Sequence, residues 1–306
     1  MALTSIPLLS SPLSSIPHRP FITFKNNNRR ISKTMIRASS STLSDGSSVL
    51  LQAAQHTVDT YVRSGMVVGL GSGKASAMAI QYLGRQLRTG ALKDIVGIPT
   101  SIASASEAAT AGIPLDQYED TSQIDFAFDD ADIIEEQTLI AIIGRRQPKG
   151  DESIIQEKSV LNTAGKLVFM ISENQYKGVV DGSIPVLIQT IENYIYFRLI
   201  GWKLQEEIDD MFLGDAEVWR RPSIGYAGPL GGDFPLVTRE GHHVLDVIFT
   251  SPIPRLAEVA QSLDNVDGVV AHGVVSKSPC TVVIASESGL STIDNISTNA
   301  AEGLQS

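Results

Sequence analysis

The chain has one cysteine, Cys280, among its 306 residues. A lone thiol excludes an internal disulfide framework and a zinc site built from several cysteines. The chain also lacks the run of about eighteen apolar residues that a membrane span needs, so we expect no membrane partner. Basic residues are few, with 24 Lys and Arg against 34 Asp and Glu and a net charge of −10. Because nucleic-acid backbones attract clustered basic side chains, this balance argues against a nucleic-acid partner.

Acidic residues are missing from the first 44 positions. The same span carries six basic residues, ten serines and four prolines. This composition is typical of an organelle transit peptide, and the dominance of Ser and Pro favours the chloroplast over the mitochondrion. A disordered tail without a targeting role is the alternative. We expect delivery to the chloroplast stroma and a mature chain from about residue 45, with 18 basic and 34 acidic residues and a net charge of −16.

Strand and helix patterns alternate through the first half of the mature chain. Short apolar runs predict strands at residues 66–70, 95–98, 113–115, 125–128 and 166–171. Helical spacing of apolar residues precedes or follows several of these runs. Such alternation is typical of a parallel, doubly wound sheet with helices on its faces. We therefore predict an α/β fold with a Rossmann-like parallel sheet.

The pattern changes after residue 182. We predict a helix over 184–203, a loop excursion over 204–235, and then a strand, a helix and a strand up to about residue 270. Elements of this size suggest a smaller α+β domain of ferredoxin-like type, with the apolar strand at 280–285 returning to the main sheet. The predicted units are a disordered leader at 1–44, a Rossmann-like domain at 45–182 and 270–306, and the smaller domain at 183–269.

A glycine-rich loop follows the first predicted strand. Residues 69–74 read GLGSGK, and a helix begins directly after them. A strand, a glycine loop and a helix in this order present backbone N–H groups and a helix N-terminus to a phosphate. The spacing fits neither the P-loop nor the dinucleotide pattern, and a tight turn without a ligand is the alternative. Thr100 and Ser101 follow the second strand, where they either cap the next helix or face the same ligand.

Carboxylates gather after the strand at 125–128. Asp129, Asp130 and Asp132 lie where open α/β sheets bind their ligands, at the carboxyl end of a strand. Glu157 follows near the predicted start of a helix. Such carboxylates suit a site that moves protons on a small polyol. Taken alone, the aspartates also fit a solvated turn, and Glu157 fits an exposed position on a helix.

These segments, in this order, resemble the A type of ribose 5-phosphate isomerase, in a plant chloroplast-type form. The family motifs are present as GLGSGKA at 69–75, GIPTS at 97–101, DDAD at 129–132 and QEK at 156–158. Gly-Pro at 228–229, Thr-Arg-Glu-Gly at 238–241 and the LDVIF, SPIP and GVVAHG stretches continue the match. The resemblance covers nearly all of residues 48–295.

The resemblance implies an aldose–ketose isomerase that interconverts ribose 5-phosphate and ribulose 5-phosphate through an enediolate, in the pentose phosphate pathway or the Calvin cycle. It implies no metal and no organic cofactor, a small sugar phosphate as the partner, and a homodimer or homotetramer. Glu157 would be the base, Asp129 would assist ring opening, and Asp132 would hold hydroxyls or orient a water. The residues that would hold the phosphate are Gly71, Ser72, Gly73 and Lys74, with Thr100 and Ser101 nearby.

The chain departs from the family pattern at several positions. Asp130 replaces a glycine and adds a like charge, which should raise the pKa of a neighbouring carboxylate or repel an anionic substrate. Lys149 is the nearest substitute for the family's catalytic lysine, with Arg145 and Arg146 as competitors. A second family lysine falls on Gln175, with Lys177 two residues away. A catalytically impaired relative that binds a sugar phosphate or regulates another protein is therefore the alternative function.

Overall fold

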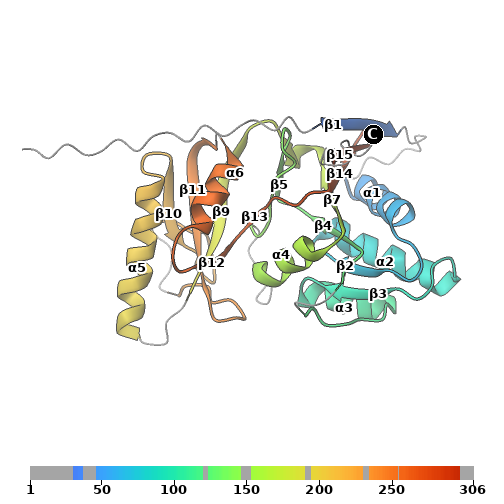
Figure 1. Ribbon diagram of the computed structural model, residues 1–306, viewed down its shortest axis with the longest axis horizontal. Helices are drawn as coiled ribbons and strands as arrows, with labels where there is room; N and C mark the ends of the chain where they lie inside the picture. Colours follow the sequence, from blue (N-terminus) through green and yellow to red (C-terminus); the bar gives the residue numbers. More distant parts are fainter. Residues whose placement is uncertain are drawn as a thin grey trace, which may run out of the picture.

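Two main sheets lie along the long axis of the molecule, with shorter strands between them (Figure 1). The computed structural model describes residues 30–36, 46–119, 123–145, 153–189, 194–229, 234–253 and 255–296. Within these residues, none of the helices combines the length and the apolar character that crossing a membrane requires.

The larger sheet has seven strands in the order β1-β15-β14-β7-β4-β2-β3. The five from β14 to β3 run parallel, and β15 and β1 are antiparallel to their neighbours. The predicted parallel sheet is therefore confirmed. In chain order the strands are β1 (Arg30–Ile36), β2 (Val67–Leu70), β3 (Val96–Pro99), β4 (Phe126–Asp130), β7 (Lys166–Ser172), β14 (Cys280–Ser286) and β15 (Gly289–Ile296).

Helices cover both faces of this sheet. Phe126 and Phe128 of β4 point to the face that is covered by α1 and α2, whereas Ala127 points to the opposite face, which packs against α4. Strands buried on both sides read as continuous apolar runs, which is why β4 and β7 were predictable. The helices of this unit are α1 (Gly46–Tyr61), α2 (Lys74–Thr89), α3 (Ile102–Ala111) and α4 (Ile154–Thr163).

Strand β1 departs from the expectation of a disordered leader. Its seven residues pair with β15 along their whole length. Without β1, the backbone N–H and C=O groups on one side of β15 would form an open sheet edge, and such an edge is a ready template for another strand. The prediction of disorder is therefore wrong for residues 30–36, and the rest of residues 1–44 lies outside the described part of the chain.

The smaller sheet is antiparallel, in the order β10-β11-β9-β12. Ile184, Val186 and Ile188 of β9 form one core with Leu204 and Ile208 of α5 and with α6. The elements are β9 (Val180–Ile188), α5 (Tyr194–Met211), β10 (Ala216–Arg220), β11 (His243–Ile253), α6 (Leu256–Asp264) and β12 (Val269–His272).

Three sequence predictions fail, two in this region and one beside β3 of the larger sheet. Residues 184–188 form a strand, not the start of a helix; Pro185 is tolerated because the pairing of β12 with β9 ends at Val186 and His272, so no ladder bond needs its missing N–H. The predicted loop at 204–235 contains the end of α5 and all of β10. The strand predicted at 113–115 is a single bridge between Gly97 and Leu115.

A third, short sheet has the order β13-β6-β5-β8. Its strands are β5 (Ile133–Glu135), β6 (Ala141–Ile142), β8 (Tyr176–Lys177) and β13 (Val274–Val275), and the 3-10 turn η1 (Glu173–Gln175) leads into β8. Figure 1 shows β5 and β13 between the two larger sheets. We propose the division into two domains on this basis, because β9 to β12 pair only with one another among the described strands.

Candidate active site

A cavity of about 450 Å³ lies at the carboxyl ends of β2 and β4. This volume is within the usual range for a site that holds a small molecule. Four of its lining residues are acidic, namely Glu107, Asp130, Asp132 and Glu157, and among the described residues that line it none is Lys or Arg. The other lining residues are Gly71, Ser72, Gly73, Ala77, Ile80, Ala103, Ser104, Ala131, Ile143 and Gly144.

Asp129 lies at the end of β4, next to the cavity wall. Its side chain is fully buried, and Oδ1 accepts hydrogen bonds from the backbone N–H of Ser72 at 2.7 Å and of Asp130 at 2.8 Å. Burial raises the pKa of the Asp129 carboxyl well above its ordinary value, and the negative charges of Glu157 and Asp130 raise it further. A solvated turn is therefore the wrong interpretation of this aspartate, and its carboxyl favours the protonated form.

Glu157 lies in the first turn of α4. The helix begins at this point because the Ser153 hydroxyl oxygen accepts a hydrogen bond from the N–H of Gln156 at 3.2 Å. Glu157 is half-buried and lines the cavity, so it is not the exposed helix residue of the alternative interpretation. Its charge acts directly on Asp129. Two neighbouring carboxyls whose environments differ in burial are an arrangement that can divide acid and base roles.

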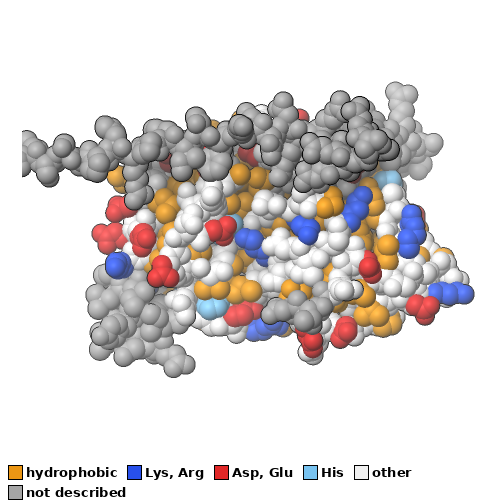
Figure 2. Space-filling view, viewed as in Figure 1, with side chains coloured by type: hydrophobic (Ala, Val, Ile, Leu, Met, Phe, Trp, Pro, Cys, Tyr) orange, Lys and Arg blue, Asp and Glu red, His pale blue; other side chains and the backbone are white. Residues whose placement is uncertain are grey.

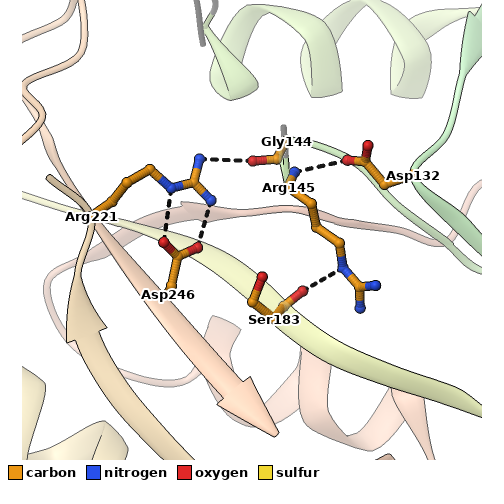
Figure 3. Close-up of polar contacts among 6 residues, drawn as sticks. All are labelled: Asp132, Gly144, Arg145, Ser183, Arg221 and Asp246. Atoms are coloured by element: carbon orange, nitrogen blue, oxygen red, sulfur yellow. Dashed lines mark hydrogen bonds and ion pairs between the residues drawn. The ribbon is translucent and has the colours of Figure 1, made fainter. Parts of the chain in front are cut away.

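Asp132 lines the same cavity two residues after β4 ends. Its Oδ2 accepts a hydrogen bond from the backbone N–H of Arg145 at 2.8 Å (Figure 3). The guanidinium of Arg145 points away, toward β9, where it donates to the carbonyl oxygens of Ser183 and Asp181, each at 2.6 Å. Arg145, one competitor for the role of the family lysine, therefore ties the cavity wall to the smaller sheet.

A buried ion pair supports this wall from the other side. Arg221 donates to both carboxylate oxygens of Asp246, at 2.9 and 2.5 Å, and also to the carbonyl oxygen of Gly144 at 2.8 Å (Figure 3). Bidentate pairs of this kind fix geometry as well as charge. The sequence did not single out Arg221 or Asp246, because their pairing depends on two neighbouring strand ends whose register is not readable from local patterns.

The hydroxyls near the glycine loop form one cluster. Ser72 Oγ lies 2.9 Å from Thr100 Oγ1 and donates to Ser101 Oγ at 2.7 Å. Ser101 also caps α3 by accepting from the N–H of Ser104 at 3.0 Å. The capping interpretation is confirmed for Ser101, and a role of Thr100 and Ser101 in binding a ligand stays a prediction. Of the hydroxyls of Ser72, Thr100 and Ser101, only that of Ser72 belongs to a residue that lines the cavity.

The glycines of the loop are required by close approach. A side chain at Gly71 would overlap the Phe128 carbonyl and Asp129, and one at Gly73 would overlap the Asp130 carboxyl. Gly73 also has a φ of 128°, which favours glycine. The loop therefore lies directly on the aspartates that follow β4.

The lysines that the sequence suggested for the site are not among the described residues that line the cavity. Lys74 is exposed and donates to the Ser47 hydroxyl of α1 at 2.7 Å, so a phosphate role for it stays a prediction. Lys158 donates to the His272 carbonyl oxygen at 3.1 Å. Gln175 has a structural role, because it donates to the Ala131 carbonyl and accepts from the N–H of Ser172 at 2.9 Å. Lys149 and Arg146 lie outside the described residues.

Glu107 is a further acidic residue that sequence reasoning missed. It reaches the cavity from α3, and Gln81 donates to its Oε2 at 3.2 Å. No local motif distinguishes it from an exposed helix residue.

On the face seen in Figure 2, Lys and Arg side chains are interspersed with Asp and Glu over the described residues.

Comparison with known proteins identifies the family to which the chain is similar. Residues 96–289 match the family model of ribose 5-phosphate isomerase A (phosphoriboisomerase A). Ribose-5-phosphate isomerase A of Synechococcus sp. is 31% identical over 244 residues, which cover 80% of this chain and 96% of the relative. The protein described as probable ribose-5-phosphate isomerase 3, chloroplastic, from Arabidopsis thaliana is 28% identical over 242 residues, covering 78% and 80%.

Solved structures give the same answer. Ribose 5-phosphate isomerase A from Methanocaldococcus jannaschii is 28% identical, with a TM-score of 0.66 over 81% of this chain and 99% of that one. The ribose 5-phosphate isomerase from Plasmodium falciparum is also 28% identical, with a TM-score of 0.68 over 81% and 98%. This chain belongs to the ribose 5-phosphate isomerase A family.

Proposed function

We propose that the chain interconverts ribose 5-phosphate and ribulose 5-phosphate, with Asp129, Asp132 and Glu157 as its catalytic acids and base. The observation that carries the proposal is the carboxyl pair of Asp129 and Glu157 at the cavity. The Asp129 pKa is raised by burial and by the charge of Glu157, so one group holds a proton while the other accepts one. The names of the relatives supply the substrate.

Ring opening uses the proton of Asp129. The C1–O bond of the furanose ring breaks, and the ring oxygen takes the proton from the Asp129 carboxyl. The anomeric hydroxyl loses its own proton to Asp132, or to a water that Asp132 orients, and C1 becomes an aldehyde. A carboxyl with an ordinary pKa would be ionised at neutral pH, so the raised pKa of Asp129 is what makes it a donor.

Isomerisation then needs one base that acts on two carbons. Glu157 takes the proton from C2, the electron pair of that C–H bond forms the C1–C2 double bond, and the charge moves to O1. The same carboxyl returns the proton to C1, while the proton of the C2 hydroxyl passes to O1, so that C2 becomes the ketone and O1 becomes a hydroxyl. The protein neither gains nor loses a proton overall. Donors aimed at the enediolate oxygens lower the barrier to this step.

Replacing Glu157 with Gln tests this assignment. The amide keeps the shape of the side chain but cannot accept the C2 proton, so we expect kcat for ribose 5-phosphate to fall about 10²- to 10⁴-fold. The matched control is Glu207→Gln, the same change on the exposed side of α5, which should leave kcat unchanged. Turnover by a folded Glu157→Gln variant at the rate of the parent would sink the assignment.

We further propose that residues 1–44 deliver the chain to the chloroplast stroma, where the reaction would serve the pentose phosphate pathway or the Calvin cycle. The absence of acidic residues in this leader and the chloroplastic form among the relatives support this. Import of a fluorescent protein fused to residues 1–44 tests it. We also propose a homodimer or homotetramer, which light scattering of residues 45–306 would distinguish from a monomer.

A further inference from the structure

The carboxylate of Asp130 occupies the N-terminus of α2. The side chain is 8% exposed; its Oδ2 accepts a hydrogen bond from the N–H of Ala75 at 3.0 Å. Its Oδ1 accepts from the N–H of Ser76 at 2.7 Å and from the Ser76 hydroxyl at 2.8 Å. The unpaired N–H groups of a first helical turn are the donors that bind anions. Here the Asp130 carboxylate already accepts hydrogen bonds from two of these N–H groups.

The helix has no cap of its own at this end. Its N-cap residue is Gly73, which has no side chain, and the Asp130 carboxyl lies so close to Gly73 that a Cβ there would overlap it. Asp130 therefore acts as the cap from a strand more than fifty positions away in the sequence. This carboxylate therefore lies against Gly73 and occupies the first-turn donors of α2, next to the loop where we predicted a phosphate.

Neighbouring hydrogen bonds and charges also disfavour the binding of a phosphate at the N-terminus of α2. The N–H of Ser72 donates to Asp129. With those of Ala75 and Ser76, three backbone N–H groups after β2 therefore donate to aspartate side chains. The cavity is lined by four acidic residues, and no Lys or Arg is among its described lining residues. A phosphate monoester carries up to two negative charges near neutral pH. The carboxylates that line the cavity would repel these charges.

We propose that Asp130 is a specificity-determining residue, an internal anion that weakens the binding of phosphate monoesters at the α2 terminus and lets an uncharged aldopentose compete for the cavity. The inference rests on the proposed function for the choice of sugar. The occupancy of the helix terminus does not depend on that function, so it can be tested by binding alone.

Two variants and one control separate charge from shape. Asp130→Asn removes the charge but keeps an oxygen that can accept from the helix N–H groups, and Asp130→Gly opens the space over the loop as well. Asp125→Asn is the matched control: Asp125 starts the same chain segment at the opposite end of β4, and its Oδ2 accepts from the N–H of Val67 at 2.8 Å. It makes the same charge change away from the cavity.

The first measurement is calorimetric binding of inorganic phosphate to residues 45–306. We expect both Asp130 variants to bind phosphate about tenfold more tightly than the parent, since a charge-assisted contact at a helix terminus is of that order. The Asp125→Asn control should match the parent. Equal phosphate affinity in the parent and in folded Asp130→Asn and Asp130→Gly would overturn the inference.

The second measurement is the ratio of kcat/KM for ribose 5-phosphate to kcat/KM for ribose. Any change in the shared chemistry cancels in this ratio, and we expect it to rise about tenfold in Asp130→Asn. If phosphate binding tightens but neither protein turns over ribose 5-phosphate, the proposed function fails and the role of Asp130 stands. If the parent turns over ribose 5-phosphate and the ratio does not move, the role of Asp130 fails and the function stands.

Discussion

The two walls of the cavity differ in what they offer a substrate. The wall from the end of β4 and from α4 presents Asp132 and Glu157 to the cavity, beside a buried Asp129 whose pKa is raised by burial. The wall from the glycine loop and α2 has the layout of a phosphate site, but the N–H groups of Ser72, Ala75 and Ser76 bond to Asp129 and Asp130. The carboxyl groups proposed for proton transfer thus lie in the described residues, whereas part of the proposed phosphate side is occupied by the protein's own carboxylates.

This difference shows that a chain can keep the strand, glycine loop and helix of a phosphate site while another group occupies the donors of the helix terminus. A strand, a glycine loop and a helix are kept at residues 67–89, and the loop still packs as tightly as its glycines allow. One aspartate in place of a glycine is enough to change what the helix terminus binds, because a carboxylate satisfies the same donors as a phosphate. The positions of Glu157 and Asp132 do not depend on this change, whereas the charge of Asp130 also raises the pKa of Asp129.

The largest effect we predict is on the proton-transfer wall. Asp129→Asn should lower kcat for ribose 5-phosphate about 10²- to 10⁴-fold, because the amide has no acidic proton to give to the ring oxygen. The same variant should be more stable than the parent at neutral pH. A pKa raised by burial means that ionised Asp129 opposes folding, so its contribution is fully present below the unfolded pKa and is lost as pH rises through the folded pKa.

Thermal unfolding of parent and Asp129→Asn between pH 4 and pH 9 measures this stability term. The difference between the two proteins should widen as pH rises, in favour of the variant. Curves that stay parallel over the whole range would contradict a raised pKa for Asp129. Full activity of Asp129→Asn would remove this residue from the mechanism and leave Glu157 and Asp132 as the reacting groups.

A second prediction concerns the support behind the wall. Arg221→Met leaves the buried Asp246 carboxylate unpaired and removes the bond to Gly144, so the free energy of unfolding should fall by about 3–5 kcal/mol. Arg255→Met, which breaks the exposed pair with Glu258, should change it by less than about 1 kcal/mol. Urea unfolding monitored by circular dichroism gives both values, and equal losses would show that the Arg221 pair is not structural.

The smallest predicted effect concerns the cation that the family's catalytic lysine would supply. If Lys149 supplies the cation that the family pattern requires, Lys149→Ala should lower kcat/KM for ribose 5-phosphate by about 10²-fold. Lys93→Ala, an exposed lysine before β3, is the control and should have no effect. An unchanged kcat/KM in Lys149→Ala would transfer the role to Lys74, Lys177 or Arg146, each testable by the same substitution.

Local sequence patterns were sufficient for the parallel sheet and for the position of the acids. A buried strand followed by aspartates needs no long-range information, and Phe126 and Phe128 share a face because strand side chains alternate. Local sequence patterns gave the wrong prediction where a helix and a strand fit the same residues equally well. Residues 184–188 are apolar and contain Pro185, which favours a helix start over a central strand, until the end of β12 is known.

Contacts between distant segments could not be predicted. Asp130 was recognised as an added charge, but its role as the cap of α2 depends on a turn that brings residues 73–76 onto the end of β4. Arg221 and Asp246 meet only because β10 and β11 pair in one register. Long-range geometry of this kind is fixed by packing of whole elements, and a local motif carries no record of it.

The central claim is that Glu157 moves one proton between C2 and C1 at this cavity. Its most direct test follows ribose 5-phosphate by proton NMR in heavy water with residues 45–306. We predict conversion to ribulose 5-phosphate with deuterium entering at C1 and, in recovered substrate, at C2, and loss of both in Glu157→Gln but not in Glu207→Gln. Binding of ribose 5-phosphate without conversion or exchange at any enzyme concentration would contradict the claim and identify a binding protein.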